Sequence, residues 1–186
     1  MAVFQSTTKD EPLDTPSVGN LSARNMVHKI DNLDRKIVAL LQEDGRMSSA
    51  EIARRIGRIS QRAVRYRIDR MLEEGVINVR AIVDPKALGF PVIGDILIEI
   101  ESGHVHEVAL QIAEFECVGY VAFSMGSSDV SIQVNARSTD ELYRFATEVL
   151  GKLQWVRKTT TAIVPQKVKD VYNWQIPSSL CVGDGQ

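Results

Sequence analysis

Long apolar runs and paired cysteines are missing from this chain of 186 residues, and no secretory signal is visible in its sequence. No apolar run approaches the roughly 20 residues that a membrane helix needs. The N-terminal segment MAVFQSTTKDEPLD lacks a basic stretch followed by an apolar one. The two cysteines, Cys117 and Cys181, form no CxxC pair and suggest no disulfide framework. We therefore expect a cytoplasmic protein of a reducing compartment with no membrane partner.

Catalytic signatures are missing as well. The sequence contains no GxSxG, HExxH, GxxxxGK(S/T) or GxGxxG, the short motifs whose residues carry known chemistry. His104 and His106 could in principle hold a metal, but no third ligand follows at a suitable spacing. A solvated helix start explains both histidines better. We expect no enzyme activity, no metal and no cofactor, with a small catalytic domain fused to a DNA-binding module as the less favoured alternative.

Lysine is absent from residues 46–80, where the arginines gather. This stretch holds nine arginines and four acidic residues, a net charge of +5, whereas the whole chain carries −2. A local basic island on an acidic protein is typical of a module that binds duplex DNA. Arginines alone would also suit an ordinary solvated helix face, so the interpretation depends on the local fold.

Residues 48–57 have the pattern of a short helix. Ser48 precedes Glu51 by three positions, which predicts a capping box in which each side chain satisfies a backbone N–H. Gly57 is suited to end the helix in a left-handed conformation. The apolar side chains of the helix are Ile52, Ala53 and Ile56.

A second helix is expected directly after this turn. Ser60 is a favourable N-cap, and Gly75 is placed to stop the helix. The apolar side chains recur at i, i+4, i+7 and i+8 on one helical face: Val64, Ile68, Met71 and Leu72. Two short helices around a Gly-containing turn predict a helix-turn-helix whose second helix reads DNA.

Flanking segments complete this domain. A preceding helix is predicted by apolar residues at helical spacing: Leu33, Ile37, Leu40 and Leu41. Residues 76–83 have the composition of a strand, which would be the wing of a winged helix. Asp84 and Pro85 interrupt that pattern, so residues 84–91 are expected to form a hinge.

The second helix presents the expected DNA-contacting face. At 100° per residue, several polar side chains project away from the apolar stripe: Arg62, Tyr66, Asp69 and Arg70, with Arg65 on the flank. Arginines of the first helix and the turn would bind phosphates, and the second helix would supply base contacts. The predicted DNA-binding residues are Arg54, Arg55, Arg58, Ser60, Gln61, Arg62, Arg65 and Tyr66.

Residues 92–168 alternate strands with helices. The expected order is a strand at 92–100, a helix at 106–115, strands at 118–125 and 130–136, a helix at 138–151 and a strand at 155–164. This βαββαβ order predicts a ferredoxin-like antiparallel sheet with both helices on one face. Because both faces of the first strand carry apolar residues, we expect a second subunit on the free face.

The expected fold class is therefore α+β, with an N-terminal winged helix-turn-helix joined to a βαββαβ ferredoxin-like domain. Polar residues without periodicity predict a disordered N-terminal extension. The predicted domains are 1–28 (disordered extension), 29–83 (winged helix-turn-helix), 84–91 (hinge), 92–168 (ligand-binding and oligomerisation domain) and 169–186 (a tail without an assigned role).

This layout resembles the Lrp/AsnC (feast/famine) family of transcription regulators. The resemblance covers roughly residues 30–168, and its specific part lies in the DNA-binding domain. The matching segments are IDNLDRKI (30–37), DGR (44–46), IARRIG (52–57), SQRAVRYRI (60–68), EGVI (74–77) and VDPKALG (83–89).

The resemblance implies a sequence-specific regulator of duplex DNA that responds to a small effector, often an amino acid. It implies a homodimer formed through the sheet, and assembly of dimers into rings such as a tetramer or an octamer. It also places the effector between dimers, near the turn at residues 126–129 and the last strand. The implied effector residues are Gly126, Ser127, Ser128, Asp129 and Thr160.

Two alternatives remain open at this point. Many relatives carry a distinctive residue where this chain has Ser127 and Ser128, and Gly, Ser and Asp are also the standard residues of a plain hairpin turn. The backbone N–H groups, hydroxyls and carboxylate of this turn equally suit a small zwitterion. The same DNA-binding module would also serve a low-specificity architectural protein, which coats DNA instead of protecting one operator.

Overall fold

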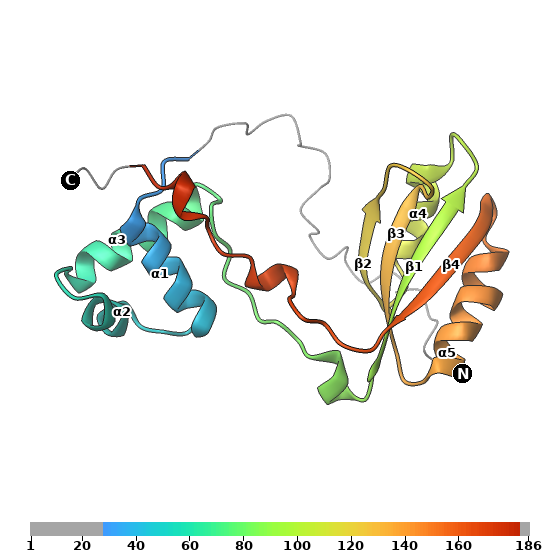
Figure 1. The fold of residues 1–186 in the computed structure, drawn as a ribbon, viewed down its shortest axis with the longest axis horizontal. Coiled ribbons are helices and arrows are strands. Elements are labelled where there is room, and N and C mark those ends of the chain that lie inside the picture. Colours follow the sequence, from blue (N-terminus) through green and yellow to red (C-terminus); the bar gives the residue numbers. More distant parts are fainter. Residues whose placement is uncertain (1–27, 183–186) are drawn as a thin grey trace. The chain divides into compact units, whose positions relative to one another are not determined.

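The first three helices of the described residues are α1 (Asn32–Glu43), α2 (Ser49–Ile56) and α3 (Gln61–Glu73), and α2 and α3 form the helix-turn-helix (Figure 1). The computed structural model describes residues 28–182, so the predicted disorder of residues 1–27 lies outside the described residues. These residues form two compact units. The helix-turn-helix unit comprises residues 28–82 and 168–182, and the sheet unit comprises residues 83–167. Within residues 28–182, no helix is both long and apolar enough to span a membrane.

Side-chain caps fix where the three helices begin. The carboxylate of Asp31 accepts the N–H of Asp34 at 2.8 Å, and the carboxylate of Asp34 accepts the N–H of Asp31 at 3.3 Å, which makes a reciprocal capping box at α1. The hydroxyls of Ser48 and Ser60 cap α2 and α3, as predicted. Only half of the predicted box at α2 forms, because the carboxylate of Glu51 turns to arginines of its own helix instead.

Apolar faces of the three helices enclose one small core. Its fully buried side chains include Ile37 of α1, Ile52 of α2, and Val64 and Met71 of α3. Gly75 follows α3 with φ +69°, which ends the helix where the sequence predicts. The spacing of apolar residues was therefore sufficient to define this core.

The predicted wing is wrong: residues 76–83 form no strand in the structure. A strand persists only where a neighbour binds its N–H and C=O groups. All four strands of the described residues belong to the sheet unit, so this segment has no strand beside it to pair with. It remains extended, with the side chain of Val79 near Gly45 after α1.

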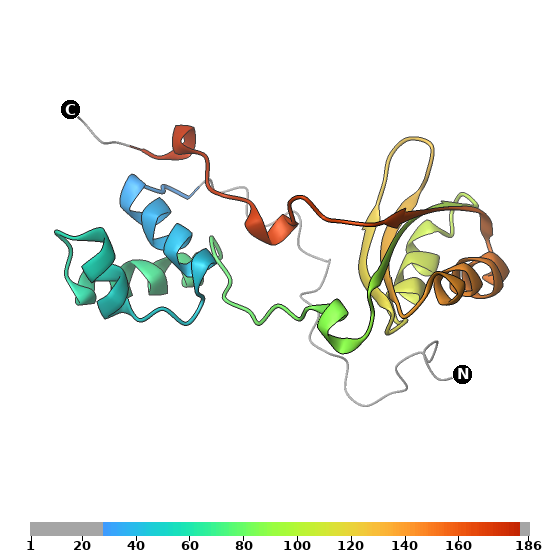
Figure 2. The ribbon, with the colours of Figure 1, turned by 60° about the horizontal axis from the view of Figure 1, so that its bottom comes forward.

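The sheet unit has the predicted βαββαβ order. Its elements are β1 (Val92–Ile100), α4 (Val105–Ala113), β2 (Val118–Phe123), β3 (Val130–Ala136), α5 (Thr139–Arg144) and β4 (Val156–Val164). The strands lie in the order β2-β3-β1-β4, and every neighbouring pair is antiparallel. Figures 1 and 2 show α4 and α5 on the same face of this sheet.

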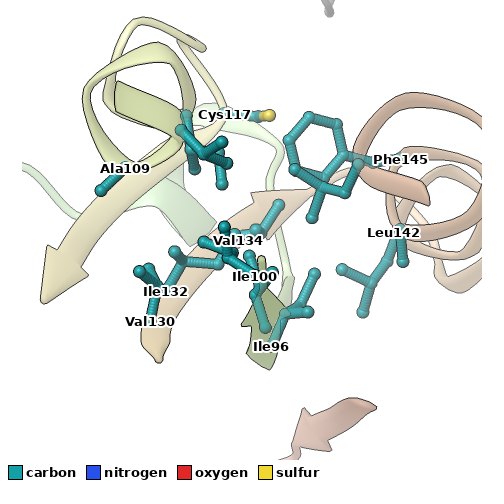
Figure 3. Close-up of a cluster of buried hydrophobic side chains, with 14 of the residues drawn as sticks. Ile96, Ile100, Ala109, Cys117, Val130, Ile132, Val134, Leu142 and Phe145 are labelled. Atoms are coloured by element: carbon teal, nitrogen blue, oxygen red, sulfur yellow. The ribbon is translucent and has the colours of Figure 1, made fainter. Parts of the chain in front are cut away.

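The core of the sheet unit lies between the sheet and these two helices. Alternate residues of β1 point into this core. Ile96 and Ile100 lie beneath Leu142 of α5 and Phe145, which directly follows α5 (Figure 3). Gly94 permits this packing, since a Cβ atom there would lie 2.5 Å from a Cδ atom of Leu142. The other face of β1 carries Asp95 and the 43%-exposed Leu97, and no helix within residues 28–182 covers it.

The second helical segment is less regular than the predicted helix at 138–151. Its α-helical part ends at Arg144, a π-helical turn follows at Phe145–Val149, and a 3-10 turn follows at Leu150–Lys152. Phe145 and Leu150 are both fully buried. The change of helical pitch thus accompanies the burial of two large side chains against the sheet.

Candidate nucleic-acid interface

The outward face of α3 is rich in exposed polar and aromatic groups. Gln61 and Arg62 lie in its first turn, and Arg65 and Tyr66 lie one turn further along, with Tyr66 68% exposed. Arg65 is only 3.9 Å from Asp69, a solvent-exposed pair that contributes little to stability. The structure therefore brings four of the predicted DNA-binding residues together on one accessible helix face.

Two further arginines of α3 point the other way. Arg67 donates to Asp31 and Asp34 of α1, both at 2.7 Å, and Arg70 donates to Asp34 at 2.6 Å. Asp34 is only 1% exposed, whereas the side chains of Arg67 and Arg70 are 25% and 30% exposed, so this is a half-buried ion-pair cluster around one buried carboxylate. Arg70 was predicted to project roughly opposite the apolar stripe with Arg62 and Tyr66, but in the structure its guanidinium binds the buried carboxylate of Asp34.

Two members of the cluster, Asp31 and Arg67, have shifted pKa values. Burial by itself raises the pKa of Asp31, but the N–H of Asp34 and the guanidinium of Arg67 outweigh burial and hold that pKa below its ordinary value. Burial likewise opposes the charged form of Arg67, yet both carboxylates raise its pKa. Asp31 and Arg67 therefore stay charged near neutral pH, and their ion pair fastens α3 to α1.

Sequence reasoning missed this cluster. Its signal was Asp31 and Asp34 at a helix start, together with Arg67 and Arg70 three positions apart on the reading helix. Each pair alone is unremarkable at a solvated surface, and only the crossing of α1 and α3 brings the two pairs together.

The arginines of α2 are exposed but paired. Arg54 donates to Glu51 at 2.6 Å, and Arg55 donates to Glu51 at 3.1 Å and to Glu43 at 2.8 Å. These hydrogen bonds from Arg54 and Arg55 lower the pKa of Glu51. Exposed pairs of this kind are weak, so a phosphate group can replace the carboxylate as the partner of either guanidinium.

The turn between α2 and α3 holds Arg58 in an uncommon conformation. Gly57 has φ +69° and Arg58 has φ +55°, a backbone region that few residues other than Gly, Asn and Asp adopt readily. Ser60 then caps α3 and is itself exposed. Among residues 28–182, neither Arg58 nor Arg62 forms an ion pair with a carboxylate, so both guanidinium groups are available to a ligand.

The turn predicted to bind an effector lies between β2 and β3. Gly126 has φ +136°, and Gly126 and Ser127 are exposed while Ser128 is half-buried. Asp129 has partners within its own chain that the sequence did not predict. Its Oδ2 accepts the N–H of Ile100 at 2.7 Å and lies 4.0 Å from Arg157. Its other carboxylate oxygen is not used in these contacts.

Thr160 lies on β4, opposite Leu97 of β1, and is exposed on the sheet face that carries no helix. The turn instead meets the end of β1 at Ile98 and Ile100. A cavity of about 330 Å³ lies elsewhere in this unit, between α5 and β4, and is lined by Tyr143 and Thr161 among others. The two histidines diverge as well: His104 stacks on Trp155, and His106 stacks on Phe123.

Comparisons with known proteins match both units. A model described as the AsnC-type helix-turn-helix domain covers residues 30–72, and a model described as the Lrp/AsnC ligand binding domain covers residues 96–174. An HTH-type transcriptional regulator of Pyrococcus furiosus is 36% identical over 73% of this chain and 91% of its own length. The regulator FL11 of the same organism is 32% identical over 73% of this chain and 89% of its own length.

Solved structures agree with the fold. AsnC of E. coli is 30% identical, with a TM-score of 0.68 over 77% of this chain and 97% of that one. A regulator of Neisseria meningitidis, solved as a complex with L-Met, is 20% identical, with a TM-score of 0.70 over 76% of this chain and 94% of that one. By sequence and by fold, this chain belongs to the Lrp/AsnC family of transcription regulators.

Proposed function

We propose that this regulator recognises a specific duplex DNA sequence through the exposed face of α3. The observation that carries the proposal is the division of the arginines of α3. Arg67 and Arg70 are held by carboxylates of α1, whereas Arg62 and Arg65 extend into solvent beside Tyr66. A reading helix needs this arrangement, because its base-contacting side chains must be free while the helix itself is fixed.

The surrounding residues fit phosphate contacts. Arg58 has no competing ion pair among the described residues, and Arg54 and Arg55 have only exposed ones. Gln61 adds a side-chain amide at the start of α3, and the exposed hydroxyl of Ser60 lies beside it. These groups would set the register of α3 on the duplex, while Arg62, Arg65 and Tyr66 read base edges.

The test begins with selection of duplexes bound by the full chain from a random pool, followed by footprinting of the recovered sequence. Arg62→Ala should weaken binding to that sequence about 5- to 150-fold, the equivalent of about 1–3 kcal/mol, with little change on random DNA. Arg144→Ala, on α5 of the sheet unit, is the matched control and should leave both affinities unchanged. An equal loss on random DNA would show that Arg62 binds phosphate, and uniform protection of the whole probe would support an architectural protein instead.

An α-amino acid is the proposed effector, and the turn at residues 126–129 is its proposed site. Backbone N–H groups at Gly126 and the two serines suit a carboxylate, and the unused oxygen of Asp129 suits an ammonium group. The Neisseria meningitidis structure with L-Met supports an amino acid as the ligand class. Thr160 is kept in the proposal, although it lies on β4, which β1 separates from the turn's own strand β3.

The Asp129 contact with Ile100 decides how this site is tested. Asp129→Asn keeps an oxygen for the Ile100 N–H but removes the negative charge. We expect amino-acid binding, measured by calorimetry across the twenty amino acids, to be lost in Asp129→Asn and kept in Asp140→Asn on exposed α5. Absence of any heat with the unmodified protein would show that the turn binds no amino acid.

A second copy of the chain is the proposed partner of the helix-free sheet face. Leu97 and Tyr120 are 43% and 54% exposed there, among small polar side chains. A two-fold dimer would place two copies of α3 about 34 Å apart, one turn of DNA, so the operator should be a palindrome. Light scattering would measure a dimer or its tetrameric and octameric multiples, and a monomer would contradict the proposal. The proposed function also includes a cytoplasmic location and no enzyme activity.

A further inference from the structure

The C-terminal segment, residues 174–182, lies against the helix-turn-helix unit, although the chain enters it from the sheet unit. Gln42, near the end of α1, donates its side-chain N–H to the carbonyl of Trp174 at 2.8 Å. At the other end of α1, the N–H of Val182 donates to the carbonyl of Ile30 at 2.8 Å. The segment therefore runs antiparallel to α1 along its whole length.

Apolar packing joins these two attachment points. Ile176 packs against the buried core of the helix-turn-helix unit, whose members on α1 include Ile37 and Val38. Cys181 forms a parallel β-bridge with Ile30, which is 7% exposed. One side-chain-to-backbone hydrogen bond, one β-bridge and one core side chain make this segment a docked element of the unit.

The segment leaves the DNA-reading face free. Its contacts fall on α1 and on Ile30, whereas Arg62 and Tyr66 of α3 remain exposed with the segment in place. It contacts the helix that holds α3 through Asp34. A blocking role is thus inconsistent with the geometry, and a supporting role is consistent with it.

We propose that residues 174–182 form a C-terminal strap that completes the helix-turn-helix unit of its own chain. The two units are then joined twice, once through residues 77–91 and once through residues 165–173. The strap lies almost wholly beyond the two family models, which end at residues 72 and 174. The core of the DNA-binding unit therefore depends on a segment that the helix-turn-helix motif itself does not contain.

A disulfide trap in the full chain tests where the strap docks. Neighbouring strands lie about 4.8 Å apart, within the range of Cα separations that a disulfide accepts. Ile30→Cys should therefore cross-link to the native Cys181 under mild oxidation. Cys117 is a poor competitor, because burial raises its pKa to about 12 and keeps the thiol protonated.

The expected product is a monomer-sized cross-linked chain, identified by the peptide pair that contains residues 30 and 181. Ile30→Cys combined with Cys181→Ser is the control and should give no such product. A dimer-sized product through these cysteines would assign the strap to the neighbouring subunit and overturn the proposal. Absence of any cross-link would overturn it equally.

Hydrogen exchange of the full chain measures what the strap contributes. Ile176→Asp places a charge in the core contact and should speed exchange of α1 amides about tenfold or more, which corresponds to about 1.4 kcal/mol. Leu180→Asp is the matched control, because Leu180 belongs to the same segment and is 56% exposed. Amides of β1 and β3 should be unaffected in both variants. Equal α1 exchange in both variants would show that Ile176 adds nothing to the unit.

Discussion

Asp34→Asn is the sharpest test of how α3 is held. The substitution keeps the size of a side chain that is 1% exposed but removes the charge that binds Arg67 and Arg70. Asn can still accept one hydrogen bond, although as a neutral group. The variant therefore isolates the charge of the cluster from its packing.

The expected magnitude follows from the contacts. Hydrogen bonds to charged groups contribute roughly 1.5–3 kcal/mol each, and neutral ones about 1 kcal/mol. Asp34 makes two charged bonds, at 2.7 Å to Arg67 and 2.6 Å to Arg70. The arginine side chains are 25% and 30% exposed, so water recovers part of the loss. We expect the free energy of unfolding to fall by about 2–3 kcal/mol, below the roughly 3–5 kcal/mol of a fully buried pair.

Native-state hydrogen exchange resolves this loss unit by unit. Amides of α1 and α3 should exchange about 30- to 150-fold faster in Asp34→Asn, the equivalent of that free energy. Amides of β1 and β3, in the other unit, serve as an internal reference. Asp69→Asn is the matched control, since Asp69 is 57% exposed and 3.9 Å from Arg65, and a change below about 0.5 kcal/mol is expected. If the two variants behave alike, the cluster does not anchor the reading helix.

Two further predictions concern packing and pH. Gly94→Ala should lower the free energy of unfolding of the sheet unit by about 1–3 kcal/mol in urea denaturation, because the added methyl overlaps the buried Leu142 side chain; Gly45→Ala, with no atom nearer than 3.7 Å, is the control and should be nearly neutral. Because the pKa of Asp31 is lowered on folding, its contribution to the free energy of unfolding is complete above its ordinary pKa of 3.8. That contribution is lost as the pH falls through the lower pKa of the folded state. In an acid titration, the helix-turn-helix unit should therefore lose this stability only below about pH 4. Asp31→Asn should remove this pH-dependent loss of stability.

Local chemistry predicted most of the elements correctly. Ser60 and Gly75 mark both ends of α3 because capping and positive φ are properties of single residues. The alternation from Ile96 to Ile100 defines β1 and its buried face for the same reason. The family resemblance added the assembly of dimers into rings and the effector between dimers, which stay predictions.

Long-range contacts were the part that local patterns could not supply. The strand predicted at residues 76–83 has the right composition, but whether it pairs depends on neighbours that its own residues do not specify. Asp34 and Arg70 are far apart in the chain, and nothing in either segment indicates that they meet. Ile176 is a single apolar residue without periodicity, so its place in the core could be seen only in the folded structure.

The docking of residues 174–182 on α1 changes the order in which the protein can mature. The sheet unit, residues 83–167, is in effect an insertion within a discontinuous DNA-binding unit. During synthesis, the ribosome completes every residue of the sheet unit before it makes Ile176. Domains generally fold as units during synthesis, the N-terminal ones first. The sheet unit can therefore fold first, whereas the helix-turn-helix unit cannot complete its core until Ile176 has been made. A chain whose synthesis stops before Trp174 would contain a folded sheet unit and an incompletely folded helix-turn-helix unit.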